Sequence, residues 1–287
     1  MPLTANIIIL NYNGKELLPQ CLPSIVEAAR KSPFPCRVTL LDNQSKDDGL
    51  SWAKQNYPEV EIVHSPQNRF LCSYNDYIAA DKDDVVILLN NDIKVDAGFI
   101  APLVKPFETD PLLFLVAPRV MDFSGKKVEA GKSRSGIRAG HFWCNARYPG
   151  YESELMQASE TDSSGFGAFS REKFIALNGY DDLYLPGIME DVDLCYRAKG
   201  AGFHLRYEPQ SVVYHIGQAS FKKVFGSKKI MTLAHRNTFL FMWKNFKSPG
   251  FWVSHVFFLP FRILWSLLKG DDTLFAGLIQ ALQKKRP

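Results

Sequence analysis

The segment Val85-Val86-Ile87-Leu88-Leu89-Asn90-Asn91-Asp92 passes without a break from five aliphatic residues to three polar ones. The aliphatic run lacks the polar alternation of a half-exposed strand, so it predicts a parallel-sheet strand covered on both faces. Open sheets of this type bind ligands beyond the carboxyl ends of their strands. Asn90, Asn91 and Asp92 are therefore predicted to face a ligand crevice.

Two earlier segments repeat this pattern and a third apolar run lies between them and Val85. Asn11 follows one aliphatic run and Asp42 follows another. The three runs are Ile7-Ile8-Ile9-Leu10, Val38-Thr39-Leu40-Leu41 and Val60-Glu61-Ile62-Val63. Amphipathic stretches separate them, and the order β-α-β-α-β-α-β predicts an α/β fold with a doubly wound, mostly parallel, nucleotide-binding sheet.

The first helix is expected over residues 17–29, where apolar residues recur at helical spacing. Pro23 lies inside it and predicts a kink or a shortened beginning.

The second half of the chain is less periodic. Residues 122–164 are rich in Gly, Ser, Lys and Arg, and they indicate a long functional loop or a small hairpin insert. Around this insert the pattern predicts helices over 98–107, 171–177 and 190–199, and strands over 113–117, 204–207 and 211–215.

Composition excludes several classes of protein. The 287 residues are 46% hydrophobic with a net charge of +4, and no basic arm or stripe suggests nucleic acid as a partner. Five scattered cysteines without a Cys-x-x-Cys pair favour a reducing cytosol over a disulfide scaffold or a zinc site. A strand predicted from Ala5 leaves no room for a signal peptide.

Six motifs in fixed order resemble the inverting family 2 glycosyltransferases of GT-A fold, and within them the bacterial rhamnosyltransferase-like branch. The resemblance covers roughly residues 5–240. The motifs are Asn11-Tyr12-Asn13-Gly14, Asp42-Asn43-Gln44-Ser45, Asn90-Asn91-Asp92, Gly179-Tyr180-Asp181, Glu190-Asp191-Val192-Asp193-Leu194 and His215-Ile216-Gly217-Gln218-Ala219-Ser220. This resemblance implies transfer of a sugar from a nucleoside diphosphate sugar to a saccharide or lipid-linked glycan in cell-surface polysaccharide synthesis.

The resemblance also implies a divalent metal cofactor, Mn²⁺ or Mg²⁺, that neutralises the leaving diphosphate. Asp92 is the implied metal ligand, and His215 is expected to complete the metal shell. Asn90 stands where the family carries the first Asp of its metal motif. The alternative is that Asn90-Asn91-Asp92 is a polar turn and His215 a structural histidine.

Donor binding is implied for a second group of residues. Asp42 is expected to accept a hydrogen bond from the nucleotide base, unless it is only a turn residue. Arg69 replaces a family glycine and either contacts phosphate or is a solvated surface cation. The remaining residues expected to bind the donor are Asn11, Asn13, Asn75, Asn90, Asn91 and Arg236.

Transfer to a hydroxyl also requires a general base. The family places it at Asp191, with Glu190 orienting the acceptor or the base. In a helix's first turn, acidic side chains also stabilise the helix dipole and cap free N–H groups. We prefer that structural interpretation for Asp193 and catalysis for Asp191.

The end of the chain changes character. Residues 1–245 are predicted to form the catalytic domain, and residues 246–287 amphipathic helices. Phe251 to Leu268 is dense in aromatic and aliphatic residues, but Arg262 and Pro260 interrupt it, which favours an interfacial helix over a membrane-spanning one. The expected location is the cytoplasm, peripheral on the cytoplasmic face of the inner membrane. The alternative is packing on the enzyme or on the second subunit of a homodimer.

Two other functions share parts of this pattern. A sugar nucleotidyltransferase would have the same sheet and metal, but it would carry a glycine- and arginine-rich phosphate loop after the first strand. A non-catalytic module that binds glycans or nucleotide sugars would need neither the base nor the metal. The nature of the released product would distinguish the three.

Overall fold

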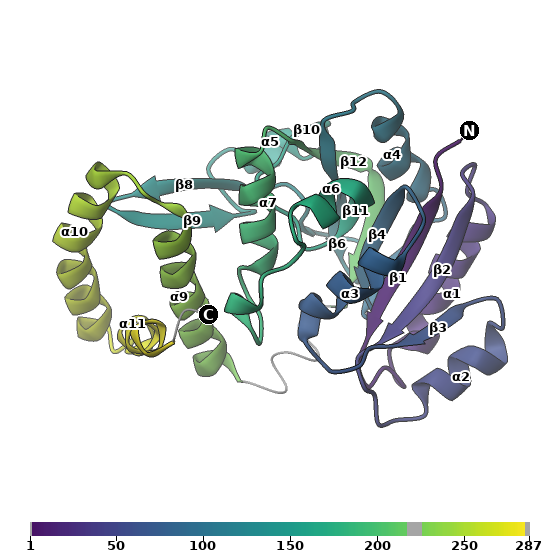
Figure 1. Ribbon diagram of the computed structural model, residues 1–287, viewed down its shortest axis with the longest axis horizontal. Coiled ribbons are helices and arrows are strands. Elements are labelled where there is room, and N and C mark those ends of the chain that lie inside the picture. The colour runs from purple at the N-terminus through teal and green to yellow at the C-terminus, as the bar shows by residue number, and fades with distance from the viewer. Residues whose placement is uncertain (1, 217–225, 285–287) are drawn as a thin grey trace.

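The structure is a computed structural model, and it describes residues 2–216 and 226–284 (Figure 1). A curled mixed sheet forms its centre, and a helical region occupies one end. The strands of the central sheet are β1 (Ala5–Asn11), β2 (Cys36–Asp42), β3 (Glu61–His64), β4 (Val85–Asn90), β5 (Ile93–Val95), β6 (Leu113–Asp122), β7 (Val128–Ala130), β10 (Ser159–Glu160), β11 (Gly167–Ser170) and β12 (His204–His215).

The strand order is β10-β12-β6-β11-β4-β1-β2-β3, with β5 paired to β12 and β7 paired to β6. The first four strands run parallel, as the apolar runs predict, whereas β11 lies antiparallel between β4 and β6. In this register Asn11 lies opposite Asp42, and Leu10 lies opposite Asn90. The predicted crevice residues therefore end neighbouring strands at one edge, and the predicted α/β fold is confirmed.

Alternating residues of the central strands feed two separate cores, because successive side chains of a strand point to opposite faces. Ile7 and Ile9 join the core beneath α1 and α4, while Ile8 joins the core beneath α3, α6 and α7. The helices on the two faces are α1 (Leu18–Arg30), α2 (Gly49–Asn56), α3 (Ser73–Ala80), α4 (Ile100–Val104), α6 (Arg171–Ala176) and α7 (Glu190–Gly200).

Several boundaries differ from the sequence prediction. Helix α1 runs continuously through Pro23, so the predicted shortening does not occur. The helix expected over 98–107 is α4 followed by a 3₁₀ turn at Lys105–Glu108. The two strands expected over 204–207 and 211–215 are one strand, β12, with an irregularity between Glu208 and Val212.

The insert over 122–164 is structured, as the hairpin alternative predicted. Strands β8 (Arg134–Arg138) and β9 (His141–Asn145) form a separate two-stranded sheet that reaches from the central sheet towards the C-terminal helices (Figure 1). A short helix, α5 (Tyr151–Glu154), follows. Phe142 of β9 lies in the same core as Phe241 and Phe246, so the hairpin joins the two parts of the molecule.

Three helices close the chain: α9 (Ser227–Asn245), α10 (Pro249–Leu268) and α11 (Thr273–Gln283). The predicted domain boundary at residue 245 falls between α9 and α10. A single apolar core nevertheless includes α9, α10, α11 and the loop residues Tyr184 and Met189. The division into a catalytic domain over 1–245 and appended helices over 246–287 therefore stays a prediction.

Candidate active site

A hydrogen-bonded network joins the ends of β1, β2 and β4. The Asn11 amide nitrogen donates to Asp42 Oδ1 at 3.3 Å and to Ser45 Oγ at 3.1 Å, and Asn91 Nδ2 donates to Asn11 Oδ1 at 2.9 Å. Asn11, Asp42 and Asn91 are all buried. Asn11 therefore connects two strand-end loops, and it holds Asp42 and Asn91 on one wall.

The loop after β1 is shaped by local polar contacts. Asn13 has a positive φ of 51°, its backbone N–H donates to Ser45 Oγ at 2.9 Å, and its Oδ1 accepts from the Lys46 N–H at 2.8 Å. A Cβ on Gly14 would lie 2.0 Å from Asn11 Oδ1, so a larger residue there would displace the Asn11 amide. The motif Asn11-Tyr12-Asn13-Gly14 thus shapes the wall that carries Asp42.

Asp92, just before β5, and His215, at the end of β12, lie together where these two strands pair. Their nearest atoms, Asp92 Oδ2 and His215 Nε2, are 3.3 Å apart. Asp92 is buried, and its Oδ1 has no hydrogen-bond partner within the described residues. A buried carboxylate oxygen without a partner is costly unless a further group binds it. A carboxylate beside an imidazole is compatible with the predicted divalent metal and favours Mn²⁺ over Mg²⁺, and within the described residues no third His, Cys, Asp or Glu completes such a site.

Glu129 of β7 is a site residue that the sequence did not reveal. Its Oε2 lies 3.4 Å from His215 Nδ1, whereas Asp92 faces the other ring nitrogen, Nε2. Burial lowers the pKa of His215, but Asp92 and Glu129 outweigh burial and the net shift is upward. Glu129 lies in the weakly periodic insert, where no motif marks it.

Glu190 and Asp191 begin helix α7, in the position predicted for the catalytic pair. Glu190 is buried and its Oε2 has no hydrogen-bond partner among the described residues, while Asp191 Oδ1 accepts from the Val192 N–H at 2.9 Å. The two residues before them, Ile188 and Met189, have φ values of 74° and 85°. Such positive φ values cost energy in residues other than glycine, and strain of this kind concentrates at functional sites.

Burial raises the pKa of both carboxyl groups, and repulsion from Asp191 adds to the shift of Glu190. For Glu190 burial acts first and the neighbouring Asp191 second, and the pKa rises to about 8. The pKa of Asp191 is also raised by burial, although hydrogen bonds from the backbone oppose the shift. A carboxylate with a raised pKa is a stronger base at neutral pH, as a general base for a sugar hydroxyl needs to be.

A short segment before β11 connects the two groups of acids. A Cβ on Gly165 would lie 3.3 Å from Asp191 Oδ2, and the ring of the next residue, Phe166, packs on His215 with ring centres 5.5 Å apart. Asp191 therefore lies beside Gly165 and His215 beside Phe166, two consecutive residues of the chain. Through Asp92, Asn91 and Asn11 the chain of contacts continues to Asp42.

Asp193 lies on the far side of the same helical turn and has no exposed surface. Arg197 donates to Asp193 Oδ2 at 2.7 Å and Lys244 to the same atom at 2.8 Å. Tyr184 and Asn245 donate to Asp193 Oδ1 at 2.8 and 3.0 Å. The structural interpretation that the sequence favoured for Asp193 agrees with these contacts, but they are ion pairs and side-chain hydrogen bonds, and none of them is the expected cap on a helix N–H group.

Helix α9 holds the loop that precedes Glu190. Asn237 Nδ2 lies 2.7 Å from the carbonyl oxygens of Tyr184 and Ile188 and 2.8 Å from that of Gly187. The guanidinium group of Arg236 donates to the carbonyl oxygen of Leu185 at 2.6 Å. Arg236 forms no ion pair within the described residues, and burial lowers its pKa. Its predicted contact with diphosphate stays a prediction.

Asn75 and Arg69 hold the loop over residues 179–182. Asn75 exchanges two hydrogen bonds with the Tyr180 backbone, at 2.8 and 2.9 Å. Arg69 forms ion pairs with Asp182 and Asp76. The Asn75 amide thus supports the loop, and a contact between Asn75 and the donor stays a prediction.

The last motif is only partly described. His215 ends β12, whereas residues 217–220 of the motif lie outside the described residues.

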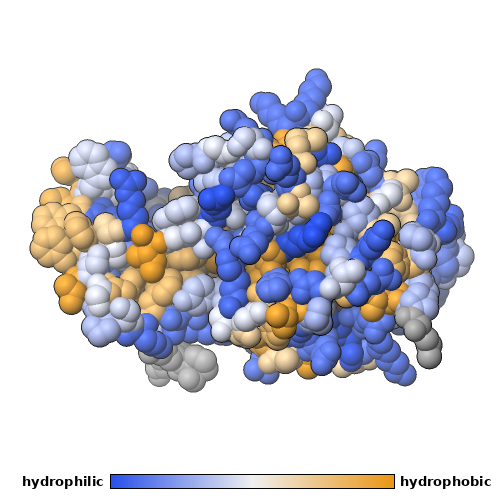
Figure 2. All heavy atoms as spheres, turned by 90° about the horizontal axis from the view of Figure 1, so that it is seen from above, coloured by the Kyte–Doolittle hydropathy of each residue, from blue (hydrophilic) through white to orange (hydrophobic). Residues whose placement is uncertain are grey.

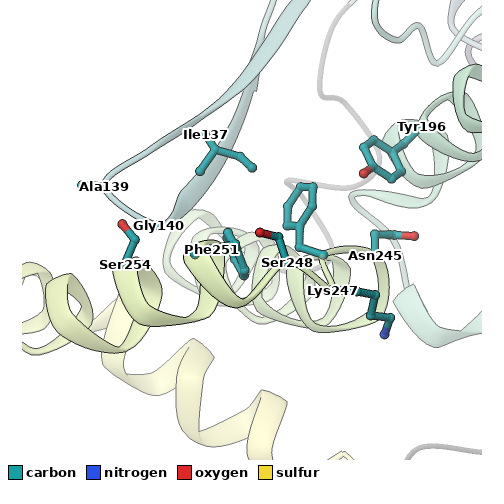
Figure 3. A pocket seen from close by; sticks show the side chains of 11 residues that line it. Ile137, Ala139, Gly140, Tyr196, Asn245, Lys247, Ser248, Phe251 and Ser254 are labelled. Atoms are coloured by element: carbon teal, nitrogen blue, oxygen red, sulfur yellow. The ribbon is translucent and has the colours of Figure 1, made fainter.

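A separate cavity of about 540 Å³ lies between the β8–β9 turn and the corner joining α9 to α10 (Figure 3). Ile137 and Gly140 line it from the hairpin, and Phe251 and Ser254 line it from α10. None of the predicted site residues belongs to its wall, so we place the candidate site at the strand ends.

Comparison with known proteins agrees with the family resemblance of the sequence motifs. The sequence model described as "Glycosyl transferase family 2" matches residues 6–177. An N-acetylglucosaminyl-diphospho-decaprenol L-rhamnosyltransferase from Mycobacterium tuberculosis is 26% identical over 271 residues, which cover 86% of this chain and 85% of that protein. A pre-mycofactocin glycosyltransferase from the same organism is 30% identical over 160 residues, covering 55% of this chain and 32% of its own length.

Two solved structures share the fold. A mannosyltransferase from Pyrobaculum calidifontis, in complex with GDP-Man and Mn²⁺, has a TM-score of 0.60 at 16% identity, covering all of this chain and 77% of that one. GalNAc-T7 with UDP, GalNAc and Mn²⁺ has a TM-score of 0.63 at 20% identity. The match covers 82% of this chain, which spans about half of the GalNAc-T7 chain, at 47%.

Proposed function

The chain belongs to glycosyl transferase family 2, and on that premise we propose that it moves a sugar from a nucleoside diphosphate donor to a hydroxyl of a lipid-linked glycan. One observation carries this proposal: Asp191 and His215 border the same Gly165–Phe166 segment, and His215 contacts Asp92. This arrangement supports a base and a diphosphate site on two sides of one reaction centre.

Asp191 is proposed as the general base. The acceptor hydroxyl attacks the anomeric carbon, its proton passes to an Asp191 carboxylate oxygen, and the bond from that carbon to the diphosphate oxygen breaks. Attack from the face opposite the leaving group inverts the anomeric centre. The nucleoside diphosphate leaves with the electron pair of the broken bond. Glu190, with its raised pKa, is mostly protonated at neutral pH and serves as a hydrogen-bond donor that orients the acceptor.

Asp92 and His215 are proposed to hold Mn²⁺ or Mg²⁺, which when bound neutralises charge on the leaving diphosphate. Both structural relatives named above contain Mn²⁺. Asp42, at the end of β2, is proposed to accept from the base of the nucleotide. Asn11, Asn13, Asn90 and Asn91 are then proposed to line the donor pocket, and Arg236 of α9 and Asn75 of α3 to border it.

The acceptor is proposed to be lipid-linked because of the surface of α10. This helix is long and apolar enough to span a membrane by length and composition, and 11% of its most apolar window is buried. One face, including Phe251 and His255, packs on the protein. The other face exposes an apolar stripe, and Figure 2 shows hydrophobic residues gathered at this end of the molecule. The stripe comprises Val253, Val256, Phe257, Phe261, Leu264, Trp265 and Leu268.

A helix packed on one side and apolar on the other suits an interfacial position better than a spanning one. Arg262 Nη2 donates to the carbonyl oxygens of Arg138 and Ala139, so it is held at the β8–β9 turn. Lys247 and Lys269 lie near the two ends of α10, where cations meet anionic head groups. We propose a peripheral position on the cytoplasmic face of the inner membrane. The name of the Mycobacterium tuberculosis relative, with its diphospho-decaprenol acceptor, supports the same placement.

The transfer proposal is tested with a panel of UDP, dTDP and GDP sugars, with and without Mn²⁺. We expect one donor to raise the melting temperature only with the metal, and turnover to release a nucleoside diphosphate. Asp92→Ala should lose the metal-dependent shift. Asp191→Asn should keep that shift and lose transfer by a factor of about 10²–10⁴. Asp76→Asn, an exposed carboxylate paired with Arg69, is the matched control.

Three results would count against this function. Release of pyrophosphate would indicate nucleotidyl transfer, and binding without turnover would indicate a sugar-binding module. Transfer by Asp191→Asn at the rate of the parent would remove Asp191 from the mechanism.

The membrane proposal is tested by flotation with vesicles containing anionic phospholipid. Phe257→Glu and Phe261→Glu should each reduce binding, whereas Leu112→Glu, at an exposed apolar residue outside the helical region, should not. Alkaline carbonate should release the protein from membranes if α10 is interfacial. Retention after carbonate would indicate a spanning helix, and a concentration-dependent dimer without vesicle binding would indicate that a second subunit covers the stripe.

A further inference from the structure

Strand β7 brings one carboxylate to the edge of the candidate metal site. Its pairing with β6 places Ala130 opposite Val120 and Val128 opposite Met121. Gly131 follows with φ +122°, and a Cβ there would lie 2.2 Å from the Pro118 carbonyl oxygen. Because only glycine allows this close approach, β7 is held tightly against β6. Glu129 lies between these two pairs, at a register shift in the pairing of β6 with β7, and irregularities of this kind can aim a side chain at a neighbouring site.

The imidazole of His215 is enclosed by three groups. Asp92 Oδ2 lies 3.3 Å from Nε2, Glu129 Oε2 lies 3.4 Å from Nδ1, and the Phe166 ring packs on the imidazole with centres 5.5 Å apart. The two nitrogens of the ring are thus distinguished by different carboxylates. Only Asp92 also has a buried oxygen without a partner among the described residues. A metal shared with Asp92 must therefore bind at Nε2.

We propose that Glu129 is a positioning residue that accepts a hydrogen bond from His215 Nδ1–H, so that Nε2 presents its lone pair to the metal beside Asp92. Histidine ligands are generally held in this way, with the second ring N–H bonded to a carboxylate or a carbonyl. The inference rests on the proposed metal role of Asp92 and His215. It adds a residue from the insert, which no motif assigns to the site.

A direct ligand role for Glu129 does not fit the geometry. Its carboxylate lies at the nitrogen that points away from Asp92, with the ring between the two acids. The side chain is also 37% exposed, whereas Asp92 is buried. Glu129 acts on the ring, and it fixes both the orientation of the ring and the nitrogen that carries the proton.

The test measures binding of Mn²⁺ alone to the full-length protein by electron paramagnetic resonance, which counts free ion. Glu129→Ala should raise the Kd for Mn²⁺ by about 10- to 100-fold. Glu129→Gln keeps an oxygen that accepts from Nδ1–H, and it should recover most of the affinity. Lys126→Ala, in the exposed turn between β6 and β7, should bind Mn²⁺ as the parent does.

A spectroscopic measurement separates positioning from general support of the fold. In the Mg²⁺-loaded protein, ¹⁵N NMR of the histidine side chains should show His215 protonated at Nδ1 in the parent and in Glu129→Gln. Glu129→Ala should show a mixture of tautomers at His215 with an unchanged urea unfolding midpoint.

Two outcomes overturn the inference while sparing the rest. Unchanged Mn²⁺ affinity in Glu129→Ala, together with lost affinity in Asp92→Ala, would remove Glu129 from the site and leave the metal proposal intact. A Glu129→Gln variant no better than Glu129→Ala would exclude the hydrogen bond as the cause. Unchanged affinity in Asp92→Ala would instead refute the proposed metal site itself.

Discussion

Asp193→Asn should lower the free energy of unfolding by about 3 kcal/mol at neutral pH, because it breaks a buried ion pair without changing the shape of the side chain. Asp193 is fully buried, and it accepts from Arg197 and Lys244 as well as from Tyr184 and Asn245. The amide of the variant can accept at one atom only, and it carries no charge.

The size of the effect follows from the exposure of the two cations. Removing one partner from a fully buried pair costs about 3–5 kcal/mol, because the other charge is left unpaired. The side chains of Arg197 and Lys244 are 21% and 29% exposed, and Lys244 keeps a second ion pair with Asp181 at 2.7 Å. Water and Asp181 compensate part of the loss, so we expect the lower end of that range.

The pH dependence of the stability difference between parent and Asp193→Asn is a second, independent test. Burial alone would raise the pKa of Asp193, but Arg197, Lys244 and Asn245 more than offset burial and hold the pKa below its usual 3.8. A carboxyl group with a lowered folded-state pKa stabilises the protein above its unfolded-state pKa and loses that contribution as the pH falls through its folded-state value. The gap between parent and variant should therefore be constant from pH 7 to about pH 5 and shrink below the usual carboxyl pKa.

Urea unfolding followed by circular dichroism at pH 7, 5 and 3 measures both effects. Asp76→Asn, which removes an exposed partner of Arg69, is the control and should change stability by less than about 1 kcal/mol. A double-mutant cycle with Lys244→Met should give a favourable coupling between positions 193 and 244. A loss below about 1 kcal/mol for Asp193→Asn, or a gap that widens in acid, would refute this account.

Three further predictions concern the loop and the site. Glu190→Gln should become more stable relative to the parent as the pH rises from about 5 to 8, since a buried carboxyl with a pKa of about 8 loses stability over that interval; a pH series of melting temperatures measures this. Asn237→Ala should cost about 1–3 kcal/mol in urea unfolding, because carbonyl groups of the loop lose their donor. Chelation of divalent cations should abolish transfer, and added Mn²⁺ should restore it; full activity after chelation would exclude the metal.

The parallel half of the sheet could be predicted from the sequence because burial on both faces leaves a plain signal. Val85 to Leu89 is aliphatic throughout, and alternate residues of the run enter two different cores. The adjacent placement of Asn11, Asp42 and Asn90 follows from parallel strands that end at one edge. Fold class, family and the glycosyl transfer activity were therefore predicted correctly.

The insert was harder to predict because few residues of its β8–β9 hairpin are apolar and buried. Phe142 packs in the C-terminal core, while Ile137 and Trp143 are exposed, so alternation is weak. The continuation of β6 to Asp122 was missed for a related reason, since Arg119 and Asp122 interrupt its apolar run. A strand can be recognised from local sequence when its pattern of apolar residues matches its burial. The burial of the β8–β9 hairpin depends on α9, which lies about a hundred residues further along the chain.

Contacts within the site depended on tertiary structure in the same way. The pairing of Asp92 with His215 was implied by resemblance, whereas Glu129 had no local signal. The contacts of Asn237 with the loop over 184–188 follow from how α9 packs. Continuity of helix α1 through Pro23 likewise reflects packing, because Leu22 and Ile25 on either side of the proline are fully buried.

The contacts of α9 and α11 with the segment before Glu190 bear on how this enzyme is produced for study. Removing the apolar tail is an obvious way to improve yield. In this molecule, however, Lys284 at the end of α11 donates to the Leu183 carbonyl oxygen, and Asn237 of α9 lies under the same segment. A shortened version that ends after α9 would keep Asn237 but lose the Lys284 contact and the packing of α11 on α9, so we expect weaker support for the proposed catalytic pair. Detergent or nanodiscs with the whole chain are the better route to an active preparation.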